Sequence, residues 1–272
     1  MIDEKVGTIA AKKIEVHLSD GKLPVELDTP HASLTDVLDL VNQGIDNILL
    51  VGPSGTGKTT LAKDLATGLK LNYGFLSLSA GVTEAHLFGR ILPQADGTWG
   101  YQSTQFVDIY ENGGVFLLDE LDAADPNLMV SVNAALANGH LSNVVNGKVH
   151  NRHPECIIIA AANTYGLGAD AQYVGRNPLD ASTLDRFVLS TVYVDYDPDL
   201  ERALTDGSPS HTSLLEWVWD IRKKIVEYRL QRVASTRLVI NGMKALSSGH
   251  DLNFIKRKFL QSWSLDEQTK VA

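Results

Sequence analysis

The chain has 272 residues, of which 44% are hydrophobic and 21% charged, a composition typical of a folded globular protein with one large domain or a medium and a small one. No apolar run reaches the ~20 residues that span a bilayer, and the N-terminus lacks the basic-then-apolar order of a signal peptide. The single cysteine, Cys156, excludes an internal disulfide, so we expect it to be buried in a cytoplasmic protein.

The net charge of −9 argues against a surface that binds duplex nucleic acid. The charge is uneven, because residues 1–199 carry 12 basic and 25 acidic side chains, whereas residues 200–272 carry 12 and 8. Two interpretations stay open. Either two surfaces are solvated independently, or an acidic body contacts a basic C-terminal part, within one chain or between subunits.

Strand and helix signals alternate from the N-terminus. Residues 13–27 alternate in polarity around Asp20-Gly21, which predicts a hairpin. Ser33 is placed to cap a helix that runs through Asn42. The next predicted elements are strand 47–51, helix 61–71, strand 75–78, short helix 84–88 and an inserted loop or hairpin at 91–104.

Three further apolar runs predict strands at 115–118, 157–162 and 187–194. Short apolar strands separated by helices indicate a parallel sheet that is buried on both faces. Two Asp-Pro pairs, at 125–126 and 197–198, predict helix starts.

A hairpin and an all-helical end complete the pattern. Asn146-Gly147 predicts a type I′ hairpin turn before the strand at 157–162. From Asp199 onward the pattern is helical. We therefore predict an α/β fold with three parts: a hairpin and helix at 1–44, an α/β core at 45–196 and a small helical part at 197–272.

Residues 52–60 match the phosphate-binding P-loop pattern in full, between a predicted strand and a predicted helix. Glycines let backbone N–H groups converge on phosphate oxygens, and the following helix adds its N-terminal partial charge. Lys58 is placed to reach the β- and γ-phosphates, and the Thr59 hydroxyl to ligate Mg²⁺. The predicted nucleotide-binding residues of the loop are Gly52, Pro53, Ser54, Gly55, Thr56, Gly57, Lys58, Thr59 and Thr60.

Polar side chains follow two of the predicted strands. Asp119 and Glu120 directly follow the run 115–118. In a phosphate-binding site, Asp119 would hold Mg²⁺ through water, and Glu120 would orient and polarise an attacking water. A solvated acidic pair is the alternative. Asn163 follows the run 157–162 and would contact the γ-phosphate or the water, although alone it suits a turn equally well.

Three arginines are candidates for contacts with nucleotide. Arg186 either pairs with a nearby aspartate or reaches the nucleotide of a neighbouring subunit as an arginine finger, which is worth ~10³-fold or more in rate. Arg176 competes for that role, and the pattern favours Arg186. Arg237 lies in the first turn of a predicted helix, where its charge opposes the helix dipole. It therefore either faces an anion or is a surface arginine.

These motifs, in this order over about residues 45–245, resemble an AAA+ ATPase, and within that class the MoxR/CbbQ/NorQ and dynein-related group. Three stretches carry the closer resemblance: the insert in helix 2 (about 89–105), the residues around the acidic strand (106–139) and the hairpin before the asparagine strand (about 141–154). The extra Arg176 is closer to dynein-related sequences and leaves the finger assignment open.

The resemblance implies an AAA+ core with a helical lid, ATP and Mg²⁺ as ligands, and a homo-oligomeric ring, usually a hexamer. It implies Lys58 and Thr59 as Walker A, Asp119 and Glu120 as Walker B, Asn163 as sensor 1, Arg186 as arginine finger and Arg237 as sensor 2. MoxR-type ATPases remodel proteins beside a von Willebrand factor A domain partner. Trp99 and Tyr101 in the insert would then either grip a client or pack the insert against its own body.

Two other functions compete with a remodelling chaperone. A nucleic-acid motor or helicase-loader-like ATPase would need basic contacts, yet the insert at 91–104 contains no lysine or arginine. An ATP-binding assembly scaffold would not need Glu120 and Arg186, which are both present. We therefore expect a protein partner, and neither nucleic acid nor a membrane.

Overall fold

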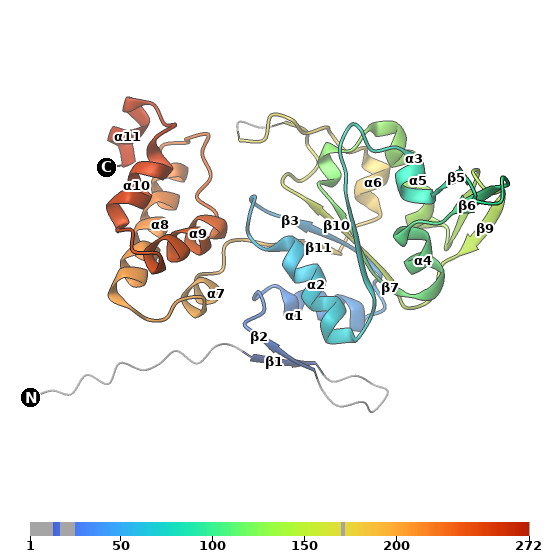
Figure 1. The fold of residues 1–272 in the computed structure, drawn as a ribbon, viewed down its shortest axis with the longest axis horizontal. Helices are drawn as coiled ribbons and strands as arrows, with labels where there is room; N and C mark the ends of the chain where they lie inside the picture. The colour runs from blue at the N-terminus through green and yellow to red at the C-terminus, as the bar shows by residue number, and fades with distance from the viewer. Residues whose placement is uncertain (1–12, 17–24, 170–171, 272) are drawn as a thin grey trace, which may run out of the picture.

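Five parallel strands form the central sheet of the protein in the computed structural model, which describes residues 13–16, 25–169 and 172–271 (Figure 1). Their order across the sheet is β11-β3-β10-β7-β4. The strands are β3 (Asn47–Val51), β4 (Tyr73–Ser77), β7 (Gly114–Asp119), β10 (Cys156–Ala162) and β11 (Thr191–Tyr193). The predicted α/β fold with a parallel sheet is confirmed.

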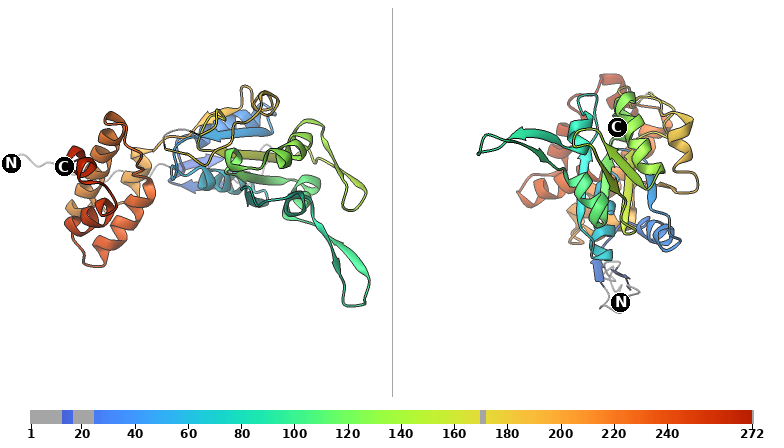
Figure 2. Two further views of the ribbon diagram at one scale, coloured as in Figure 1. Left: turned by 90° about the horizontal axis from the view of Figure 1, so that it is seen from above. Right: turned by 90° about the vertical axis from the view of Figure 1, so that its right-hand side faces the viewer.

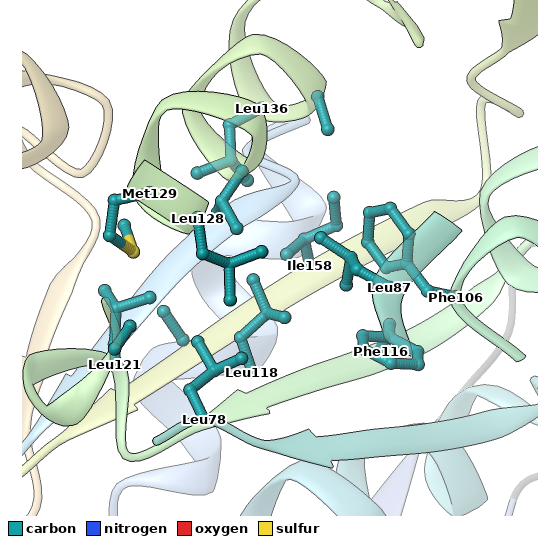
Figure 3. Close-up of a cluster of buried hydrophobic side chains, with 14 of the residues drawn as sticks. Leu78, Leu87, Phe106, Phe116, Leu118, Leu121, Leu128, Met129, Leu136 and Ile158 are labelled. Carbon is teal, nitrogen blue, oxygen red and sulfur yellow. The ribbon is translucent and has the colours of Figure 1, made fainter. Parts of the chain in front are cut away.

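Helices cover both faces of this sheet, because successive side chains of a buried strand point to opposite sides. On one face α1 (Leu34–Asn42) and α2 (Lys58–Leu69) pack on Ile48, Leu50 and Val115. The other face packs against α3 (Glu84–Phe88), α4 (Gln105–Asn112) and α5 (Pro126–Ala137). Figure 3 shows this second cluster, in which Phe116, Leu118 and Ile158 of the sheet meet Leu87 and Leu128 of the helices.

Three antiparallel hairpins accompany the sheet: β1 (Lys13–Val16) with β2 (Val25–Asp28), β5 (Arg90–Pro93) with β6 (Trp99–Gln102), and β8 (His140–Asn143) with β9 (Lys148–Asn151). The first is the predicted N-terminal hairpin, whose expected Asp20-Gly21 turn lies outside the described residues. The second is the predicted insert and projects from the body (Figure 2).

The two aromatic side chains of the insert differ in their surroundings. The Tyr101 hydroxyl donates a hydrogen bond to Phe88 O at 2.5 Å and accepts one from Asn143 Nδ2 at 3.0 Å. Tyr101 therefore packs against the body of its own chain. Trp99 is 71% exposed on the projecting hairpin.

The type I′ turn predicted at Asn146-Gly147 is wrong. Asn143 pairs with Lys148, so residues 144–147 form the connection, and among them only Gly147 has a positive φ, of 68°. The side chain of Asn143 accepts from Val145 N and that of Asn146 from Lys148 N, each at 2.9 Å. Two asparagine side-chain turns thus replace the two-residue turn.

Other predicted boundaries shift by a few residues. Helix α2 begins at Lys58 instead of residue 61. Strand β4 spans Tyr73–Ser77 instead of the predicted 75–78. The strand predicted at 187–194 shortens to β11, because Phe187–Ser190 forms a turn in which Leu189 adopts a φ of 65°. Ser33 occupies the N-cap of α1, but its side chain makes no capping bond to a described residue. Cys156 is buried as predicted.

After α6 (Ala181–Asp185) and β11, the chain is helical to its last described residue, as predicted. We call these helices the lid: α7 (Pro198–Ala203), α8 (Pro209–Glu227), α9 (Thr236–Ser247), α10 (Leu252–Leu260) and α11 (Leu265–Val271). The lid has its own apolar core and lies at one end of the molecule (Figure 1). In the described ranges, no helix combines the length and apolar character that crossing a membrane requires.

Glu201 on α7 ties three lid helices together. Its side chain is fully buried and accepts hydrogen bonds from both terminal nitrogens of Arg222 at 2.8 and 2.6 Å. It also accepts from Trp219 Nε1 and from Thr236 Oγ1, each at 2.7 Å. A buried carboxylate is tolerated only with such partners, so this cluster fixes where α9 begins.

We expect Glu201→Gln to destabilise the lid by about 3–5 kcal/mol, because it leaves the largely buried Arg222 guanidinium without its counter-charge. Urea unfolding followed by tryptophan fluorescence measures this loss. The control is Asp199→Asn on the same helix, whose ion pair with Arg202 is exposed and should cost less than about 0.5 kcal/mol. Equal unfolding midpoints for the two variants would contradict the prediction.

Candidate functional site

The P-loop joins β3 to α2 and curls above the carboxyl end of the sheet. Gly55 and Gly57 adopt φ values of 75° and 103°, which L side chains rarely adopt. A Cβ on Gly52 would stand 2.0 Å from Val194 O, so only glycine lets the loop pass the chain after β11. No described side chain caps the start of α2. Its first N–H groups therefore remain available to an anion.

Lys58 is buried at the start of α2 and points back into the loop. Its Nζ donates to Gly52 O at 2.7 Å, to Pro53 O at 2.9 Å and to Asn163 Oδ1 at 3.0 Å. Burial lowers the pKa of Lys58 to about 8, against the opposing attraction of Asp119 and Glu120. The ammonium group is thus held close to carbonyl dipoles in a position that an anionic ligand would stabilise.

The predicted polar groups meet at the ends of three adjacent strands. Thr59 Oγ1 donates to Asp119 Oδ2 at 3.0 Å, and Asn163 Nδ2 donates to Glu120 Oε2 at 3.1 Å. Glu120 has a φ of 58°, an uncommon backbone conformation that clusters at functional sites. Its N–H donates to Asp119 Oδ1 at 2.9 Å. The structure therefore brings Lys58, Thr59, Asp119, Glu120 and Asn163 together.

The oxygens of Thr59 and Asp119 fit a magnesium ion. Mg²⁺ takes oxygen ligands in an octahedral shell, usually one or two from the protein and the rest from phosphates and water. Within the described ranges no group of three or more histidine, cysteine, aspartate or glutamate side chains forms a metal cage. A hydroxyl and a carboxylate beside a phosphate-binding loop suit an ion that arrives with its nucleotide.

A cavity of about 430 Å³ opens over this cluster. One side is polar and consists of Ser54–Thr60, Asp119, Glu120 and Asn163. The rest of the lining is formed by Asp28, Thr29, His31, Asp64, Leu200, Leu204, Thr236, Arg237 and Ile240. The polar side suits phosphates and the apolar residues suit a planar base. Arg237 lines the cavity from α9, and its Cγ would lie 3.8 Å from a Cβ built on Gly55. This position fits the predicted role of facing an anion and not that of a surface arginine.

Among the residues that line the cavity, the sequence analysis missed Asp28, Thr29, His31, Asp64, Leu200, Leu204, Thr236 and Ile240. His31 Nδ1 accepts from Ser33 N at 3.0 Å, so its Nε2 carries the proton and donates to Asp195 O at 2.9 Å. Nothing in the local sequence marks these residues, because the cavity is assembled from segments far apart in the chain.

The two competing arginines lie in different places. Arg186 is outside the cavity, where its Nε donates to Asn133 O at 3.1 Å and its Nη1 to Ser182 O. Arg176 lies against the acidic residues of its own chain, where its Nη1 contacts Glu120 Oε2 and stands 3.3 Å from Asp122 Oδ1. Asp122, which the sequence analysis also missed, is fully buried. Its position two residues after Glu120 was the available signal.

The fold and this cavity define a P-loop ATPase of the AAA+ class, with the loop, the acidic pair and the polar strand end at one edge of a five-stranded parallel sheet. Residues 47–187, just over half of the chain, match the AAA domain (dynein-related subfamily), and the chain belongs to that family. The resemblance inferred from the sequence is confirmed.

Known relatives agree with this membership. An uncharacterized protein of Staphylococcus epidermidis is 30% identical over 158 residues, 56% of this chain and 57% of that relative. The chain thus spans little more than half the length of that relative. The denitrification regulatory protein NirQ of Pseudomonas aeruginosa is 28% identical over 83% of this chain and 85% of its own length. The crystal structure of an ATPase candidate from Cytophaga hutchinsonii shares the fold, with 16% identity and a TM-score of 0.51 over 85% of this chain and 81% of that one.

Nucleotide binding at alkaline pH should take up a proton through Lys58. Because its pKa is about 8 in the free protein, a large fraction is neutral at pH 8.5, and a bound anion favours the charged form. Isothermal titration calorimetry with ADP, in buffers of different ionisation enthalpy, measures the number of protons taken up on binding. We expect this number to be roughly threefold larger at pH 8.5 than at pH 7.5. Uptake that does not rise over this range would contradict the prediction.

Proposed function

We propose that this protein is a Mg²⁺-dependent, ATP-hydrolysing ring ATPase of the MoxR type, which uses hydrolysis to remodel or activate a protein partner in the cytoplasm. The observation that carries the proposal is the convergence of Lys58, Thr59, Asp119, Glu120 and Asn163 on one cavity that Arg237 also lines. Groups that bind phosphate, hold a cation and activate water are all present within it.

Each polar group has a task in this reaction. The N–H groups of the P-loop and the Lys58 ammonium bind the β- and γ-phosphates. Thr59 and Asp119 would hold Mg²⁺, and the bound ion would neutralise phosphate charge. Glu120 accepts a proton as water attacks the γ-phosphorus, and Asn163 orients Glu120 and the water. The bond from water oxygen to phosphorus forms while the bond to the β–γ bridging oxygen breaks, giving ADP and phosphate.

A ring would complete the site from a second subunit. Arg186 lies outside the cavity of its own chain, which supports a role as arginine finger in a neighbour's site. A head-to-tail contact between identical subunits closes into a ring when its rotation allows, and a hexamer is the usual result in this class. The contrast between an acidic body and a basic lid favours such a contact. Arg237, on the lid, would sense the γ-phosphate.

The insert is the proposed contact with the partner protein. Trp99 is 71% exposed on a hairpin that projects from the body (Figure 2), and exposed tryptophan is a frequent anchor in protein interfaces. The relative NirQ is named a regulatory protein, which is consistent with an action on another protein. A partner with a von Willebrand factor A domain is the class that the resemblance implies.

Replacing Glu120 by glutamine should abolish turnover and leave nucleotide binding intact, because the amide keeps the size of the side chain and cannot accept the proton from water. We expect at least about a 100-fold loss of kcat, with ATP affinity within about twofold. Steady-state ATPase assays and titration with a fluorescent ATP analogue measure the two quantities. Glu216→Gln, an exposed change on α8, is the matched control. Unchanged hydrolysis in Glu120→Gln would refute the mechanism.

The same variant, held in the ATP state, should retain a protein partner during affinity capture, and Trp99→Ala in that background should reduce the recovered partner about tenfold or more. Val130→Ala, which removes an equally exposed apolar side chain from α5, should leave recovery unchanged. Equal recovery with all three proteins would exclude Trp99 from the contact. Stimulation of the ATPase by DNA at physiological salt would favour a nucleic-acid motor instead.

A further inference from the structure

Arg176 is fixed in place by the residue that follows it. The backbone N–H of Asn177 donates to Asp122 O at 2.7 Å, and its side chain donates to Ala124 O at 2.9 Å. These carbonyls belong to the turn η1 (Leu121–Ala123) and its end, directly after Glu120. The segment that carries Arg176 is therefore anchored to the same turn that sets the position of Glu120.

Asp122 supplies the counter-charge that keeps Arg176 there. Its carboxylate is fully buried, and Oδ2 accepts from Asn163 N at 3.1 Å and from Thr164 N and Oγ1 at 2.9 Å. Oδ1 has no hydrogen-bond partner among the described residues, and Arg176 Nη1 stands 3.3 Å from it. A buried carboxylate needs opposite charge close by, so Arg176 satisfies Asp122 electrostatically.

Arg176 contacts Glu120 without itself lining the nucleotide cavity. Glu120 lines that cavity and Arg176 does not. Both contacts on the Glu120 carboxylate, from Arg176 Nη1 and from Asn163 Nδ2, fall on Oε2. Neither of these contacts uses Oε1, so one oxygen of the carboxylate is held by protein donors and the other stays available to a ligand.

We propose that Arg176, with Asp122 as its buried counter-charge, is a positioning residue that orients Glu120 for hydrolysis within its own subunit, and is not the arginine finger. This inference rests on the proposed role of Glu120. Two fixed donors on one carboxylate oxygen limit the rotation of the side chain, and such pre-organisation of a reacting group governs rate more than ground-state binding. Because Asp122 also holds the backbone of Asn163, the pair aligns both residues.

The first test is Arg176→Met, which keeps the aliphatic stem and removes the charge. We expect kcat to fall roughly 10- to 100-fold while KM for ATP stays within about twofold. Arg176→Lys should recover part of kcat, because one ammonium group serves Asp122 or Glu120 but does not reproduce the guanidinium contact with both. In a Glu120→Gln background, Arg176→Met should cause no further loss in single-turnover rate, since it acts through Glu120. Unchanged kcat in Arg176→Met, or a full additional loss in the double variant, would overturn the proposal.

The second test separates a role within the subunit from a finger in the neighbouring site. Arg176→Met subunits are mixed with Lys58→Ala subunits, which keep Arg176 but lose ATP binding. A positioning residue predicts no ATPase activity above the sum of the two proteins, whereas a finger would be restored by the neighbour and give a clear gain. Arg186→Ala mixed in the same way is the comparison and should show that gain.

The outcomes distinguish this inference from the proposed function. A gain for Arg176→Met in mixtures refutes the inference alone. Normal hydrolysis by Glu120→Gln refutes the proposed function, whatever Arg176 does. Thermal unfolding of each variant accompanies the assays, and Arg176→Lys carries the test if Arg176→Met unfolds, because it keeps a charge beside Asp122. In that case, wild-type kcat in Arg176→Lys would leave Arg176 no positioning role, because the lysine does not reproduce the guanidinium contact with both carboxylates.

Discussion

The position of β10 between β3 and β7 is the constraint on which the site depends. Parallel pairing sets Ala162 beside Val51 and Ala160 beside Leu118, so the three strands end at one edge and in step. The P-loop leaves β3, the acidic pair ends β7 and Asn163 ends β10. Ligands of open α/β sheets bind at the carboxyl ends of the strands for this reason. If β10 slipped by one residue, Asn163 would lose its place beside both Lys58 and Glu120.

Ser54 of the P-loop is one of the residues that link this edge to the lid. Ser54 is held on both sides, because Tyr196 OH donates to its carbonyl at 3.1 Å and its N–H donates to Tyr173 OH at 2.9 Å. The Arg222 guanidinium lies 3.8 Å from the centre of the Tyr196 ring and binds Glu201 at its other side. Glu201 in turn fixes Thr236, the neighbour of Arg237. A continuous chain of polar and stacking contacts thus runs from the phosphate-binding loop to the lid arginine.

Short-range patterns explain what the sequence could predict. The strands, the P-loop and the aspartate caps depend on neighbouring residues, and Asp125 and Asp197 cap α5 and α7 through hydrogen bonds to nearby N–H groups. Long-range packing decided the rest. The turn at 144–147 follows from Asn143, which is also tied to Phe88 and Tyr101. Likewise, Arg176 and Asp122 meet only because the chain after β10 folds back on η1, which no spacing in the sequence reveals.

The charges around the cavity explain why the two halves of the site need each other. Asp119, Glu120 and Asp122 lie near Lys58 and Arg176, and Arg176 already contacts Glu120 and Asp122, while Arg237 lines the cavity from the lid. The acidic side is therefore short of positive charge, while the buried Lys58 ammonium, with its lowered pKa, is short of a strong anion. A nucleotide triphosphate that arrives with a divalent cation satisfies both deficits at once. Under the proposed function, a nucleotide or a cation alone would correct one deficit and leave the other, so we expect the site to prefer the metal–nucleotide complex.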